Sequence, residues 1–224
     1  EICIHTRLAA SAVRATTMDR PEWVAAHPKK SDVYCALTNN SRRGRGSNAG
    51  GDAMPAAGPN PRARNIYGQI VRWRPDGGDH AAPGFRWDLF VLAGNPKVHR
   101  GARRGSANVT VRNMFNSPDG LSFGPGGLLW IRTDGNDSDQ EHFAGMGNNQ
   151  MLAGDPATGE IRRFLVGPPD CEVTGLTWSA DGRTMFVGIQ HPGVDGNSRF
   201  PDGGSAPPRS CVIAVRRDDG APFG

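Results

Sequence analysis

Acidic residues occupy corresponding places in a pattern that recurs along the chain. Glu22 and Asp119 each stand just before a short segment of alternating apolar residues. In a further copy of the pattern this place is taken by Thr174, and Glu172 lies two residues before it. Side chains two residues apart on a β-strand point to the same side, so we expect Glu172 to face the same way as the other two acids.

Acids that converge in a folded protein need a counter-charge. Neighbouring carboxylates repel one another and are costly to remove from water, and a bound cation relieves both costs. Because these ligands are all oxygens, the set suits calcium or another hard metal ion. Glu22, Asp119 and Glu172 are therefore predicted metal ligands. Asp134 is a fourth candidate, although an Asp-Gly pair is also a common turn. Taken singly, each acid can instead cap a turn or pair with an arginine.

Other residues that carry chemistry form weaker patterns. His191 ends a predicted strand, where a structural role competes with a place beside the acids. Asn39 and Asn40 follow another predicted strand and can either bind a metal or an anion or form a turn. The four cysteines are widely spaced without a Cys-x-x-Cys pair. This spacing argues against a zinc site and is typical of buried free thiols.

An internal repeat predicts the fold that positions the acids. Residues 118–131 and 174–188 share one pattern, in which a Gly-Leu-x-aromatic segment runs through a glycine turn into a second apolar segment. A more degenerate copy spans 22–37. Further short strands are predicted at 68–73, 150–153, 160–164 and 211–215. The copies at Gly120 and Gly175 are spaced as four-stranded propeller blades with a long loop would be, so we expect an all-β fold, a β-propeller.

Composition narrows the choice of function. The 224 residues include 31 glycines and 18 prolines, which is typical of a turn-rich globular chain. The net charge is +4, but the arginines are scattered through loops without interleaved aromatics. This favours a solvated basic surface over a nucleic-acid site. No apolar stretch is long enough to cross a membrane. The polar segments 41–64 and 136–149 are predicted to be either functional lids or disordered tips.

Several motifs together resemble the PhoX-type secreted alkaline phosphatases. Their order along the chain matches that family, and Arg-Pro-Glu-Trp followed by Cys-Glu-Val-Thr-Gly is the most specific part. The motifs are residues 6–10 (TRLAA), 18–23 (MDRPEW), 37–40 (LTNN), 117–121 (SPDGL), 129–135 (LWIRTDG), 171–175 (CEVTG) and 190–193 (QHPG). The resemblance covers almost the whole chain.

The resemblance implies an exported enzyme, periplasmic or secreted, that hydrolyses small phosphomonoesters with calcium and iron in a six-bladed propeller. Glu22 and Glu172 match the family's metal ligands, and Asp119 is a plausible third. No nucleic-acid or membrane partner is expected, and the complete protein is expected to be a monomer. Six blades do not fit into 224 residues. We therefore expect residues 1–224 to form a partial propeller, the C-terminal blades, that is poorly stable and weakly active or inactive alone.

Two other functions remain open. A calcium-dependent lactonase or esterase can use the same architecture with the same channel carboxylates. A non-catalytic propeller could present its glycine- and arginine-rich loops to a partner, and it would hold no metal. Fold alone does not decide among the three.

Overall fold

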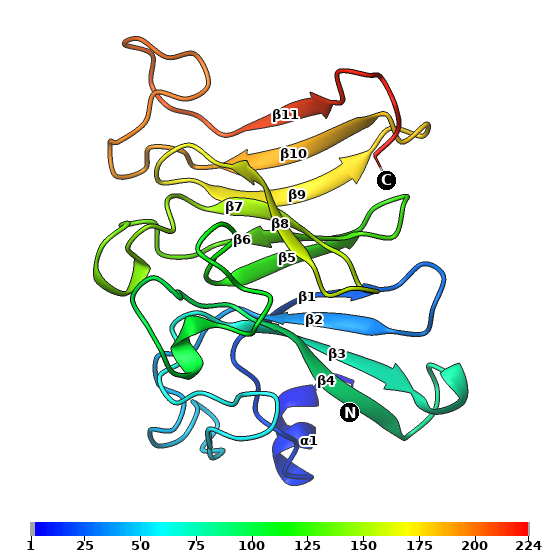
Figure 1. Cartoon of the computed structure of the whole chain (residues 1–224). Coiled ribbons are helices and arrows are strands. Elements are labelled where there is room, and N and C mark those ends of the chain that lie inside the picture. The colour runs from blue at the N-terminus through cyan, green and yellow to red at the C-terminus, as the bar shows by residue number, and fades with distance from the viewer. Residues whose placement is uncertain (1–2, 224) are drawn as a thin grey trace.

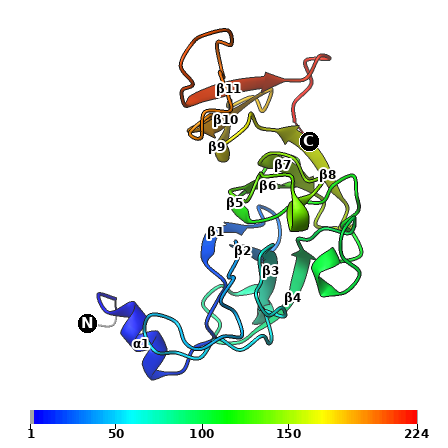
Figure 2. The ribbon, with the colours of Figure 1, turned by 90° about the vertical axis from the view of Figure 1, so that its left-hand side faces the viewer.

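The computed structural model describes residues 3–223 and consists almost entirely of β-structure. Three antiparallel sheets lie one beside the next in chain order, as Figures 1 and 2 show. The first sheet contains β1 (Pro21–Ala26), β2 (Val33–Leu37), β3 (Gln69–Pro75) and β4 (Phe85–Leu92). The second contains β5 (Pro118–Phe123), β6 (Leu129–Thr133), β7 (Gln150–Gly154) and β8 (Ile161–Val166). The third contains β9 (Glu172–Trp178), β10 (Thr184–Gln190) and β11 (Cys211–Arg216).

The predicted all-β fold is confirmed, and each predicted repeat begins a sheet. The copies at 22–37, 118–131 and 174–188 are the hairpins β1–β2, β5–β6 and β9–β10. The third unit has three strands among the described residues, where four were expected for a blade.

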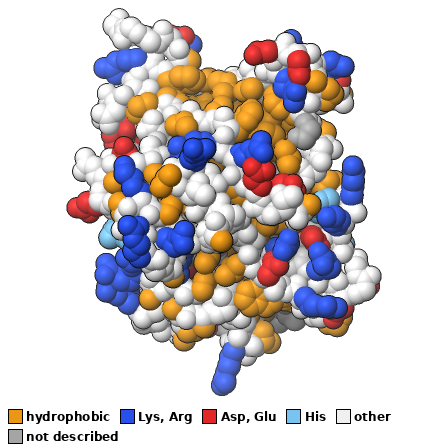
Figure 3. Space-filling model, in the orientation of Figure 1, with side chains coloured by type: hydrophobic (Ala, Val, Ile, Leu, Met, Phe, Trp, Pro, Cys, Tyr) orange, Lys and Arg blue, Asp and Glu red, His pale blue; other side chains and the backbone are white. Residues whose placement is uncertain are grey.

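Two hydrophobic cores separate the three sheets. The side chains of β6 alternate between them: Leu129 and Ile131 lie in the core shared with the first sheet, and Trp130 lies in the core shared with the third. The central sheet is thus covered on both faces, which explains why all five residues of β6 are buried. Strand β11 alternates between exposed and partly buried residues. On this strand Val212 is 68% exposed. Hydrophobic side chains reach the surface over the upper part of the molecule in Figure 3.

Helical structure is confined to short segments. The α-helix α1 spans Thr6–Ala12 and buries none of its residues. Single 3₁₀ turns occur at Asp76–Gly78, Ala102–Arg104 and Glu141–Phe143. In the part of the chain that the structure describes, no helix has the length and apolar character needed to cross a bilayer.

Both long loops are held in place by specific contacts. In the loop at 41–64, the Arg43 guanidinium is fully buried and lies 2.6 Å from the equally buried Asp19 carboxylate. The Arg43 Nη atoms also donate to the hydroxyl and carbonyl of Thr17. In the loop at 136–149, the carbonyl of His142 accepts a hydrogen bond from the Tyr67 hydroxyl. Of the two alternatives for these loops, the contacts favour ordered segments over disordered tips.

Candidate metal centre

The predicted acids stand at the beginnings of three neighbouring strands. Glu22 and Asp119 are the second residues of β1 and β5, and Glu172 is the first residue of β9. Strand β5 contacts both β1 and β9, so the first strands of the three sheets lie side by side. The two-residue offset of Glu172 in the sequence pattern is therefore consistent with its place at the same end of its sheet.

The backbone leading into each of these strands has the same irregularity. Two residues before each acid is a non-glycine residue with positive φ: Arg20 at 49°, Ser117 at 50° and Asp170 at 61°. Such conformations are unfavourable for residues with a side chain and persist where surrounding contacts enforce them. The pairing register of each strand also shifts near its start, over Pro21 to Val24 in β1 and Pro118 to Leu121 in β5. Register shifts of this kind re-aim side chains and are frequent beside functional sites.

Three carboxylates converge at this end of the sheets. One oxygen each from Asp119, Asp134 and Glu172 can be chosen so that all lie within 4.8 Å of one another. We call these three residues the acid cluster. Asp134 directly follows β6 and was the weakest of the four predicted ligands, yet it belongs to this group. Glu22 lies beside the cluster, and its charge acts on both Asp119 and Glu172.

The acids destabilise one another's charged forms. Burial, followed by the charges of Glu22 and Asp134, raises the pKa of Asp119 from 3.8 to about 6. Burial, followed by the charges of Asp134 and Asp119, raises the pKa of Glu172. A hard cation relieves this repulsion, and the ligands offered are all carboxylate oxygens. The residues present therefore fit a calcium-type ion. They supply no sulfur or imidazole ligand that would select a softer metal.

Two arginines flank the acids, and the sequence did not distinguish them from the others. Exposed Arg20 lies 3.6 Å from Glu22, and its Nη1 donates to Asn39 at 3.5 Å. Arg132 is fully buried, and its charge interacts with that of Asp119. Burial lowers the pKa of Arg132 to about 10. Each stands two residues before an acid, Glu22 or Asp134, but this spacing does not single them out, because Arg86 and Arg217 precede Asp88 and Asp219 in the same way.

The Arg132 guanidinium has few partners for a buried cation. Its Nη1 donates to the Ser122 hydroxyl at 3.2 Å, and its Cζ lies 5.1 Å from the centre of the Trp23 ring. The Nε and Nη2 atoms have no hydrogen-bond partner among the described residues. Gly120 leaves the space for this group, since a Cβ at that position would lie 2.5 Å from Arg132 Nε.

The remaining candidates fall near the acids or are structural. His191 lies 3.7 Å from Glu172, and its Nδ1 is 3.0 Å from the Asp170 carbonyl oxygen. Asn39 contacts Arg20 and donates to the Ser117 hydroxyl at 3.0 Å, so it borders the site. Asn40 instead orders its own loop, where its side chain accepts a hydrogen bond from the Arg42 amide.

The cysteines and one serine are not placed as nucleophiles. All four cysteines are free, and Cys3 is exposed, contrary to the prediction of buried thiols. Burial raises the pKa of Cys171 to about 12, which keeps this thiol protonated. Ser122 is the centre of a Gly-Leu-Ser-Phe-Gly sequence, the spacing of a hydrolase nucleophile elbow, which sequence reasoning missed. It lies within hairpin β5–β6 rather than at a strand-to-helix turn.

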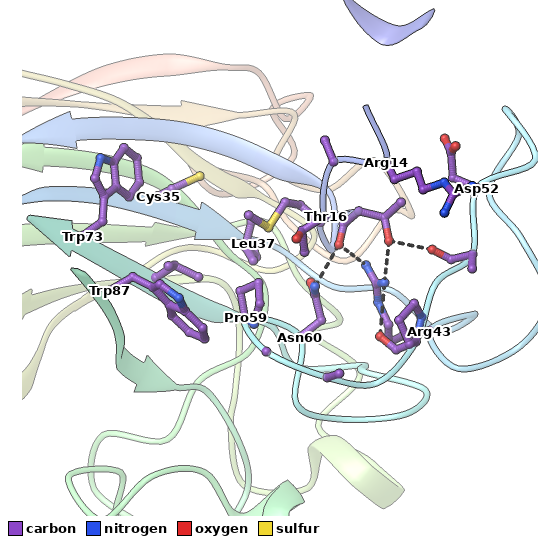
Figure 4. A pocket seen from close by; sticks show the side chains of 18 of the residues that line it. Arg14, Thr16, Cys35, Leu37, Arg43, Asp52, Pro59, Asn60, Trp73 and Trp87 are labelled. Carbon is purple, nitrogen blue, oxygen red and sulfur yellow. Dashed lines mark hydrogen bonds between the residues drawn. The ribbon is translucent and has the colours of Figure 1, made fainter. Parts of the chain in front are cut away.

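A cavity lies away from the acids. It has a volume of about 990 Å³ and is mostly apolar, with Trp73 and Trp87 at one end and Arg43 and Asp52 at the other (Figure 4). None of the four predicted ligands lines it. The chemistry of the chain is therefore concentrated at the strand starts and not in this cavity.

Comparison with known proteins identifies the family of the chain. The family model described as alkaline phosphatase PhoX matches residues 1–193. The chain belongs to the PhoX alkaline phosphatase family. A solved structure described as Pseudomonas fluorescens PhoX in complex with vanadate, a transition state analogue, is 59% identical with a TM-score of 0.94. The match covers 99% of this PhoX-family chain and 37% of that protein. No curated protein matches the chain.

Proposed function

We propose that this chain contributes the metal centre of an alkaline phosphatase that hydrolyses small phosphomonoesters. The observation that carries the proposal is the convergence of Asp119, Asp134 and Glu172 within 4.8 Å, where β5 and β9 begin and β6 ends. Family membership and the likeness to a PhoX that binds a transition state analogue support it.

We assign the acid cluster and Glu22 as ligands for calcium and iron. The carboxylate set suits calcium directly, and carboxylates also serve as iron ligands. When bound, such cations would neutralise charge on a phosphate ester and lower the pKa of a water molecule. The acids themselves hold position and do not act as acid or base.

The chain's cationic groups would orient the ester. Arg20 is exposed beside Glu22, and its planar guanidinium can donate two parallel hydrogen bonds to phosphate oxygens. The buried charge of Arg132 cannot reach a substrate without movement, so its effect is electrostatic. It offsets part of the negative charge of Asp119.

The architecture and setting follow from the same proposal. The three sheets would be blades of a six-bladed propeller, with β1, β5 and β9 as innermost strands around the channel. The chain would be the C-terminal part of a monomeric, periplasmic or secreted protein, without nucleic-acid or membrane partners. Alone, with the faces of its end sheets uncovered, it would be poorly stable and weakly active or inactive.

The test uses the chain in two forms, as the 224 residues and as a chimera completed with the remaining segments of the Pseudomonas fluorescens relative. Elemental analysis should find calcium and iron in the chimera, together with turnover of p-nitrophenyl phosphate. Chelation and Glu172→Gln should each abolish turnover. Glu160→Gln is the matched control, because Glu160 is an exposed glutamate paired with Arg162. A metal-free, inactive chimera would refute the proposal.

The same chimera separates the alternatives. A calcium-dependent lactonase or esterase would turn over a lactone faster than a phenyl phosphate. A non-catalytic scaffold would hold no metal and would be unaffected by Glu22→Gln.

The role of Arg20 gives a separate prediction. Arg20→Ala should raise the KM for p-nitrophenyl phosphate by roughly tenfold or more, since a charged hydrogen bond is worth about 1.5–3 kcal/mol. Arg217→Ala removes the same charge from an exposed arginine paired only with its neighbour Asp219, and it should leave KM unchanged. Equal kinetics for the two variants would exclude Arg20 as a phosphate ligand.

A further inference from the structure

Two buried asparagines connect the segments that carry the acid cluster. Asn116 and Asn149 are 5% and 7% exposed, respectively. Asn116 lies just before β5, and Asn149 lies just before β7. Neither residue carries a charge, yet both form hydrogen bonds with backbone groups within two residues of an acid of the cluster.

Asn149 joins the segment of Asp134 to the segment of Glu172. Its Oδ1 accepts hydrogen bonds from the Thr133 hydroxyl at 2.8 Å and the Gly135 amide at 2.7 Å. Its Nδ2 donates to the carbonyl oxygens of Gly135 at 3.0 Å and Cys171 at 2.9 Å. Thr133 and Gly135 are the two neighbours of Asp134, and Cys171 directly precedes Glu172. One side chain thus holds the two neighbours of Asp134, Thr133 through its hydroxyl and Gly135 through its backbone, together with the backbone that leads into Glu172.

Asn116 joins the same turn to the segment of Asp119. Its Nδ2 donates to the Asn136 carbonyl at 3.0 Å, and its Oδ1 accepts from the Asn136 amide at 3.1 Å. The Oδ1 atom also accepts a hydrogen bond from Ser117, the positive-φ residue that leads into Asp119. Gly135 passes so close to Asn116 that a Cβ there would overlap its Oδ1 atom. The turn after β6 is therefore held between the two amides.

We propose that Asn116 and Asn149 are positioning residues that fix the spacing of the acid cluster for metal binding. The inference rests on the proposed function, in which the acid cluster holds metal. Groups that orient ligands typically change metal affinity by about 10- to 100-fold when removed. A purely structural amide costs stability without such a change, and this difference makes the proposal testable.

The chain supplies a close control for Asn149. The Oδ1 atom of Asn113 accepts from the Thr110 amide and hydroxyl, and its Nδ2 donates to the carbonyls of Asn108 and Ile161. Asn113 is 8% exposed and its side chain makes four hydrogen bonds, as that of Asn149 does, but its partners adjoin neither the acid cluster nor Glu22. Both Asn→Ala variants should lower the melting temperature by similar amounts. Calcium titration by calorimetry should show affinity at least about tenfold weaker in Asn149→Ala and within about twofold of wild type in Asn113→Ala.

A second, milder pair of variants keeps the test usable if the alanine variants do not fold. Thr133→Val removes one hydrogen bond to Asn149, and Thr110→Val removes the equivalent bond to Asn113. Calcium affinity should fall a few-fold in the first, as expected for one hydrogen bond, and stay unchanged in the second. If wild type binds calcium and the Asn149 and Thr133 variants bind as their controls do, the positioning role is overturned and the metal site stands. All of these titrations use the chimera. If the chimera without these substitutions binds no calcium, the proposed function fails and this inference fails with it.

Discussion

Asp119→Asn should stabilise the metal-free chain while weakening its affinity for calcium. The raised pKa means that the folded protein holds a proton on this carboxyl more tightly than the unfolded chain does. Stability of the metal-free protein therefore falls as pH rises from 3.8 towards 6, and it stays low above that range. Asparagine cannot ionise, so the variant lacks this loss. The difference between variant and wild type should be small near pH 4 and fully developed at pH 8.

The expected gain in stability follows from the pKa shift of Asp119. A pKa raised from 3.8 to about 6 corresponds to about 3 kcal/mol at 1.36 kcal/mol per pKa unit. Asp119 is only partly buried, and solvent screening reduces the figure to about 1–2 kcal/mol. That gain is a measurable part of the roughly 5–15 kcal/mol by which native proteins are stable.

Urea unfolding in the presence of a chelator, at pH 4 and pH 8, measures the effect. Asp181→Asn is the control of opposite sign. Hydrogen bonds from Ser179 and the Arg183 amide lower the pKa of Asp181, so its carboxylate stabilises the fold above pH 4 and its removal should cost stability at pH 8. Calorimetry with calcium should show weaker binding for Asp119→Asn. Equal stability of Asp119→Asn and wild type at pH 8 would show that the carboxylates do not repel as the geometry requires.

Two further substitutions test the framework around the site. Gly120→Ala should destabilise the chain by about 1–3 kcal/mol in thermal unfolding, because the added Cβ would overlap Arg132. Gly175→Ala is the control at the equivalent position of the repeat. It has open space around it and should leave the stability unchanged. Arg43→Ala should cost about 3–5 kcal/mol in urea unfolding because it leaves the buried Asp19 charge unpaired, and Asp19→Asn combined with it should recover part of that loss.

The repeat and three of the four candidate ligands, Glu22, Asp119 and Glu172, could be proposed from sequence because their places depend on strand periodicity. The Gly-Leu-x-aromatic pattern placed the hairpins, and the two-residue period placed Glu172 on the side of Asp119. Asp134 could not be ranked in this way, because it lies in a turn after β6 and not in a strand. Its distance from the other acids is set by Asn116 and Asn149, which act from residues far along the chain.

The roles of the arginines could not be predicted from the sequence for a related reason. Nothing local distinguishes Arg132 from the other arginines, because its burial arises from packing against Trp23 on another sheet. The ion pair of Asp19 with Arg43 also joins distant residues, so the order of the loop at 41–64 could not be read from its polar composition.

The charges at the strand starts argue for more than one metal ion. Glu22 and the acid cluster carry four negative charges, and Arg20 and Arg132 carry two positive charges. One divalent cation neutralises the remainder and leaves no attraction for an anionic substrate. Two divalent cations leave a surplus of two positive charges, which matches the dianion of a phosphate monoester. Because complementary charge in a preorganised site is what binds a phosphoryl group, the balance favours a site that holds at least two cations when it receives substrate.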